Sequence, residues 1–226
     1  MENMTLQTKK QQSGFTLIEI AIVLVIIGLL LGGVLQGQQL IENSRVRSAT
    51  NDFNGIAAAA FSYQDRYGRL PGDDPNADSG RGAAWPATAA GSQGNGDGVI
   101  TGTLANTFDG GGEVGLFFRN LMSSGFIPGD GLNDTGINAL PQNPFGGLTG
   151  ITNQLVFGGL AGTKVCMSNV SGTAANALDT QLDDGSAQTG RFRGEDDTAT
   201  NTAPTNTAHT SANYDESAIF TICYRI

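Results

Sequence analysis

A single carboxylate, Glu19, interrupts an otherwise apolar stretch that runs from Phe15 to Leu35. A carboxylate inside hydrocarbon costs about 3 kcal/mol on insertion scales, so it is a functional candidate whose partner should be named. One interpretation is that Glu19, one turn into a helix, reaches the lipid headgroups or is protonated. The other is that cleavage between Gly14 and Phe15 creates an α-ammonium group four residues from the carboxylate.

Such a cleavage would place two opposite charges at one end of an apolar rod. In a staggered pile of identical helices, Glu19 of one copy can neutralise the amino terminus at Phe15 of its neighbour, and this pairing sets the axial register. On this hypothesis, polymerisation depends on cleavage, because cleavage creates the amine with which Glu19 pairs.

The apolar stretch itself, residues 15–35, has the length of a membrane span. At about 1.5 Å per residue it covers roughly 31 Å, close to the thickness of the hydrocarbon layer. Lys9 and Lys10 precede it and the flank after it begins with neutral residues, so the charge bias predicts a cytoplasmic amino terminus and export of everything after about residue 38. An ordinary secretory signal would have a shorter apolar core.

The segment SGFTLIE at residues 13–19, after a short basic leader and before a long apolar helix, resembles the processing site of type IV pilins and type II secretion pseudopilins. The likeness covers roughly residues 9–35. It implies cleavage after Gly14 by a membrane prepilin peptidase, N-methylation of Phe15 and inter-subunit pairing through Glu19. It also implies storage in the inner membrane, and then a periplasmic or extracellular filament containing copies of the chain, other pilins and contacts with an assembly platform.

The predicted fold class is α+β, a long amino-terminal helix packed on a small antiparallel sheet with long loops. We expect a leader at 1–14, a membrane and filament-core helix at 15–37, its amphipathic continuation at 38–67 and an exported head at 68–226. The continuation rests on apolar residues spaced by three and four, followed by Gly68 and Pro71 as a stop. These apolar residues are Val46, Ala49, Phe53, Ile56 and Ala60.

Within the head, the pattern predicts short elements separated by glycine-rich loops. Helices are expected at 112–124 and about 173–182. A surface loop is expected at 196–211, which is rich in Thr, Asn and Ala. The predicted strands are 99–104, 154–157, 163–167 and 219–224.

Acidic residues in two neighbouring loops could hold a hard cation. Asn95 and Asp97, followed by Gly98, match the middle of an EF-hand loop, but its first and twelfth positions lack the usual acids. Asp73 and Asp74 are the best additional donors, so a Ca²⁺ site from these four residues is one expectation. The other is two ordinary turns. For the second cluster, Asp179, Asp183 and Asp184, we favour a helix end and turn over a metal site.

Two cysteines, Cys166 and Cys223, lack metal-site spacing, so in an exported head they predict one disulfide. The formal net charge of −9 argues against a surface that binds nucleic-acid phosphates. His209, the only histidine, is expected to be exposed, and no nucleophile motif accompanies it. We therefore expect no enzyme.

The leading functional hypothesis is a structural subunit of a type IV pilus-like filament. The alternative is a minor pilin or secretion pseudopilin whose head binds a surface, a substrate or a partner. A third, less favoured, is a membrane-tethered domain that never polymerises.

Overall fold

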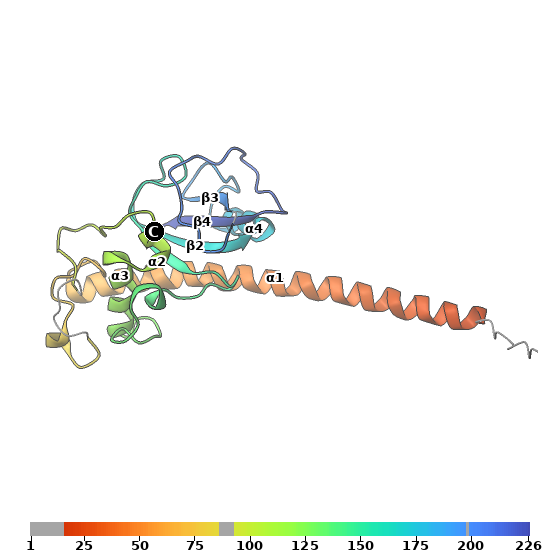
Figure 1. The fold of residues 1–226 in the computed structure, drawn as a ribbon, viewed down its shortest axis with the longest axis horizontal. Helices are drawn as coiled ribbons and strands as arrows, with labels where there is room; N and C mark the ends of the chain where they lie inside the picture. The colour runs from red at the N-terminus through yellow and green to blue at the C-terminus, as the bar shows by residue number, and fades with distance from the viewer. Residues whose placement is uncertain (1–15, 86–92, 198) are drawn as a thin grey trace, which may run out of the picture. The chain divides into compact units, whose positions relative to one another are not determined.

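The computed structural model describes residues 16–85, 93–197 and 199–226. The chain divides into two compact units, residues 1–42 and residues 43–226. Helix α1, Leu17–Tyr67, contributes to both (Figure 1). The fold is α+β, as the sequence predicts.

In the first unit, the helix presents apolar side chains on every side. From Leu17 to Ile41 its large apolar side chains are between 47% and 90% exposed. Helix α1 contains an 18-residue window of mean hydropathy 2.8, none of it buried, which is long and apolar enough to cross a membrane. A helix that is apolar all round has no solvent-facing side, unlike the surface helix of a soluble domain.

In the second unit, α1 becomes amphipathic. The predicted stripe is buried, and Ala59 and Tyr63 extend it. The ring of Phe53 lies edge-on to those of Phe192 and Tyr224, with centroids 6.1 and 5.7 Å away. The helix ends where predicted, because Gly68 adopts a left-handed φ of 68° and donates its N–H to the carbonyl of Gln64 at 2.8 Å.

The sheet against which this stripe packs has four antiparallel strands in the order β1-β2-β4-β3 (Figure 1). Two predicted helices are confirmed, α3 and α4. The strands are β1 Thr149–Thr152, β2 Lys164–Ser171, β3 Phe192–Asp197 and β4 Ile219–Arg225. The helices are η1 Ser79–Arg81, α2 Asn106–Asp109, α3 Gly112–Ser123, η2 Gly136–Ala139 and α4 Gly172–Leu182.

Two of the four strand predictions are right and two are wrong. Strands β2 and β4 lie at 163–167 and 219–224 as expected, although β2 is longer. Residues 99–104 form no strand, because buried carboxylates take up backbone N–H groups in that region. Residues 154–157 form only an isolated bridge from Val156 to Leu160, and Phe157 has a left-handed φ of 49°, which ends any extended run.

The sequence analysis missed β1 and β3. Strand β3 reads FRGEDD, which lacks the apolar alternation of a half-buried strand, yet it pairs along its full length with β4. Its last two residues lie in the segment predicted as a loop, so that expectation was wrong for Asp196 and Asp197. From 199 to 211 the chain is irregular, as expected.

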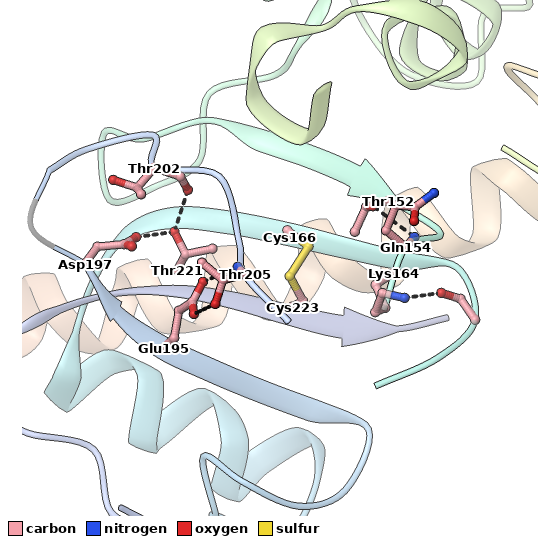
Figure 2. Close-up of a disulfide and its surroundings, with 11 residues drawn as sticks. Thr152, Gln154, Lys164, Cys166, Glu195, Asp197, Thr202, Thr205, Thr221 and Cys223 are labelled. Atoms are coloured by element: carbon pink, nitrogen blue, oxygen red, sulfur yellow. Dashed lines mark hydrogen bonds between the residues drawn. A yellow bond between two sulfur atoms is a disulfide. The ribbon is translucent and has the colours of Figure 1, made fainter. Parts of the chain in front are cut away.

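The predicted disulfide joins Cys166 and Cys223 on the two central strands (Figure 2). The two residues face each other in the β2–β4 register with Cα atoms 4.0 Å apart. Because side chains alternate along a strand, the bridge lies on the face opposite Tyr224, which packs on α1. The bridge therefore ties the last strand to the centre of the sheet.

Removing this bridge should destabilise the protein. The disulfide closes a loop across 57 positions, which corresponds to about 4 kcal/mol in the chain-entropy account. Urea unfolding of Cys166→Ala/Cys223→Ala in detergent should give a lower midpoint than the oxidised wild type. A reducing agent should bring the wild type to the variant's midpoint and leave the variant unchanged. Equal midpoints for the oxidised wild type and the variant would contradict this.

Candidate functional site

At the start of α1, the carboxylate of Glu19 is hydrogen-bonded to Thr16. The hydroxyl of Thr16 accepts the N–H of Glu19 at 3.3 Å, and the Glu19 carboxylate accepts the Thr16 N–H at 2.8 Å and its hydroxyl at 2.6 Å. This reciprocal arrangement is a capping box, in which two helix-end N–H groups find side-chain acceptors. Glu19 therefore lies at the first turn of the helix as a hydrogen-bonded, exposed carboxylate.

The other residues predicted to take part in processing, Gly14 and Phe15, lie outside the described residues. Cleavage between them and methylation of Phe15 stay predictions. Between Glu19 and Glu42 the helix carries no other charged residue. This part of the helix therefore needs an apolar environment, such as lipid chains or other apolar helices, because water would leave its whole apolar surface hydrated.

The first acidic loop is held together by Asp73. Its carboxylate is buried and accepts three backbone N–H groups, from Gly96 at 2.7 Å, Asp97 at 3.1 Å and Gly98 at 2.7 Å. Gly94 makes the close approach possible, because a Cβ there would lie 2.2 Å from the Asp73 carbonyl carbon. Asp73 and the 95–98 loop are therefore close together, as the sequence predicted. The contact is made by backbone N–H groups that donate to the Asp73 carboxylate.

Asp74 has different partners from its neighbour. Its carboxylate is fully buried, accepts the Tyr63 hydroxyl at 2.7 Å and lies 2.5 Å from the Arg81 guanidinium. Arg81 also donates to the Tyr63 hydroxyl at 2.9 Å and lies over the ring of Tyr67. Asp74 thus fastens the chain after α1 back onto the end of that helix.

The sequence analysis missed one important carboxylate, Glu113, in the first turn of α3. It is 8% exposed and accepts the N–H of Asn95 at 3.0 Å and that of Thr101 at 2.6 Å. With Asp73, it holds the loop from Asn95 to Thr101 by backbone bonds at both ends. Its position at the start of a helix was visible in the sequence, but nothing there indicated that it would reach a distant loop.

The four residues proposed for calcium are therefore already hydrogen-bonded. Asn95 and Asp97 bond to each other, with the Asn95 amide donating to the Asp97 carboxylate at 3.0 Å. A cation held by Asp73 would have to displace at least one of its N–H donors, and Asp74 is neutralised by Arg81. The Ca²⁺ site stays a prediction, and the arrangement seen in the structure is that of two linked turns.

The second acidic cluster lies at the end of α4. Oxygens of Asp179, Asp183 and Asp184 come within 4.8 Å of one another. Each carboxylate accepts hydrogen bonds from the chain that follows. Asp179 accepts from Gly185 at 3.0 Å and from the Tyr214 hydroxyl at 2.7 Å. The cluster forms the helix end and turn that the sequence favoured.

His209 is buried, which corrects the expectation of an exposed histidine. Its side chain is 6% exposed, its Nε2 lies 2.6 Å from the Asp196 carboxylate, and its ring centroid lies 5.6 Å from that of Phe220. The low apolar content around it gave no sign that strand β3 would supply a partner. The contact fastens the irregular segment 199–211 to the sheet.

Comparison with known proteins finds one match. Residues 9–35 match the family described as "Prokaryotic N-terminal methylation motif". No curated protein and no solved structure matches the chain. The matched residues include the start of α1, where Glu19 is hydrogen-bonded to Thr16.

Replacing Asp73 should loosen the loop that it holds. Asp73→Asn replaces one of the two acceptor oxygens with an NH₂ donor, so at least one of the three N–H groups loses its acceptor, and the free energy of unfolding should fall by about 1–3 kcal/mol. Asp65→Asn is the matched control, because it makes the same change at an exposed carboxylate on α1. Urea unfolding of the two variants in detergent measures the difference. Identical midpoints would show that the Asp73 contacts do not stabilise the loop.

Asp179 should make the fold more stable in mild acid. Burial raises the pKa of Asp179 to about 6, against an ordinary value of 3.8. Between about pH 4 and 6 the folded state then binds more protons than the unfolded state, so stability falls as the pH rises through that window, by up to about 3 kcal/mol. Asp179→Asn should flatten that part of the profile, measured by unfolding at fixed pH values. An unchanged slope in the variant would contradict the assignment.

Proposed function

We propose that this chain, which carries the amino-terminal methylation motif of type IV pilin-class prepilins, is a structural subunit of a type IV pilus-like filament. It is held in the inner membrane by the apolar half of α1 and is cut after Gly14 by a prepilin peptidase. It then polymerises through the same helix.

The observation that carries the proposal is the exposed apolar surface from Leu17 to Ile41, with Glu19 as its charged residue. Lipid chains can cover the apolar side chains, but hydrocarbon supplies no counter-charge for Glu19. A neighbouring copy supplies both the apolar cover and the counter-charge, because it brings an equally apolar helix and, after cleavage, an α-ammonium at Phe15. Polymerisation therefore satisfies the whole surface, whereas the membrane satisfies only part of it.

The capping box supports this mechanism. In the structure, Thr16 satisfies one oxygen of the Glu19 carboxylate through its N–H and its hydroxyl. Among the described residues no donor contacts the second oxygen, which is available to the ammonium group of another copy. The pairing between copies therefore does not require the helix start to unfold.

A direct test replaces Glu19 while leaving the cleavage site intact. Glu19→Ala should still be cleaved and retained in the membrane, but its share of sheared filaments should fall more than about tenfold, because the ammonium group loses its buried partner. The matched control is Asp65→Ala, which removes an exposed carboxylate from the same helix and should assemble as the wild type does.

Immunoblots of the membrane and filament fractions measure both quantities. If Glu19→Ala and Asp65→Ala enter filaments equally well, the carboxylate has no role in assembly. A wild-type chain that is absent from every filament fraction would overturn the proposed function itself.

A further inference from the structure

The second unit has a groove beside α1. Its volume is about 400 Å³, and it opens between the helix and two loops, around residues 126–128 and 141–149. The walls are largely apolar, with one carboxylate on the helix side. The lining includes Asp52, Ile56, Phe126, Ile127, Pro128 and Pro141.

Asp52 is the charged residue in the lining of this groove. Among the residues that the structure describes, it has no hydrogen bond and no ion pair, and its side chain is half-buried. Burial raises the pKa of this carboxyl, with no partner to offset the cost. A half-buried carboxylate in an apolar groove favours an occupant with a cationic head and an apolar stem, which is the description of an arginine or lysine side chain.

The same helix carries a suitable cation, Arg47. It is exposed, and within the described part of the chain it makes no hydrogen bond and no ion pair. At 100° per residue, five positions place it about 140° around the helix from Asp52, so it points away from the groove of its own copy. Two copies lying side by side in the same orientation therefore turn Arg47 of one toward Asp52 of the other.

We propose that the groove over Asp52 is the docking site for the Arg47 side chain of the next copy in the filament. The guanidinium pairs with the carboxylate, and the stem lies against Phe126, Ile127 and Pro128. This inference rests on the proposed function, since it requires assembled copies. It adds a second charge pair between copies, and it lowers the repulsion between these acidic chains.

Disulfide trapping in assembled filaments tests the contact. In Arg47→Cys/Asp52→Cys, the Cα atoms of the two new cysteines of one chain lie about 8–9 Å apart. This is too far for a disulfide within the chain. We expect oxidised filaments of this full-length variant to give a ladder of linked subunits on a non-reducing gel. Neither single variant should give the ladder.

Charge exchange provides a second measurement that does not depend on new thiols. Asp52→Arg and Arg47→Asp should each lower filament yield about tenfold, because attraction becomes repulsion. The double exchange should restore the yield to within about twofold of the wild type. Arg69→Glu, which reverses an exposed arginine outside the helix, should leave the yield unchanged.

The outcomes separate this inference from the proposed function. Filaments of the double cysteine variant that contain only unlinked subunits would overturn the docking site and leave the filament role standing. So would a double charge exchange with yields as low as those of the single variants. If the wild-type chain forms no filaments, the filament role fails as well.

Discussion

An apolar helix surface without a partner in its own chain is the constraint on which the rest of this structure depends. The side chains from Leu17 to Ile41 bury nothing in the monomer. At about 25 cal/mol per Å², such a surface cannot be left in water. Lipid and a bundle of identical helices are two environments that can cover it. In the proposed function Glu19 favours the bundle, because a neighbouring copy would bring the counter-charge.

The second unit solves a different problem, which is to hold long, glycine-rich loops on a small sheet. It does so largely with buried carboxylates that accept backbone N–H groups. Asp73 and Glu113 hold the loop at 95–101, and Asp179 holds the turn after α4. Each contact supplies an acceptor that a strand would otherwise provide, and acceptors of this kind keep irregular backbone satisfied. The acidity of the sequence thus has a structural use within the fold.

The sequence predicted best where a physical period or a sharp boundary was present. The stripe from Val46 to Ala60, the stop at Gly68 and the Cys166–Cys223 bridge all follow from spacing or from residue type, and the structure contains them. Strand β3 was missed because its pairing with β4 overrides a polar composition. The partner of His209 and the reach of Glu113 depend on loops folding back over long stretches of sequence, which no local pattern records.

The two charge pairs proposed for assembly join different copies, so the fold of a single chain fixes only half of each pair. The structure supplies the half that one chain can show: a hydrogen-bonded Glu19 at the helix start, and a half-buried Asp52 in an apolar groove. The other half proposed in each case is a cation, the amine of Phe15 or the guanidinium of Arg47. The first of these cations exists only if the leader is removed.

Intact-mass spectrometry of the protein from its native cells tests this account most directly. The account predicts a mass that lacks residues 1–14 and carries one added methyl group on Phe15. An unprocessed chain, or one cut at another position, would leave Glu19 without the ammonium group that it is proposed to pair with, and would contradict the account.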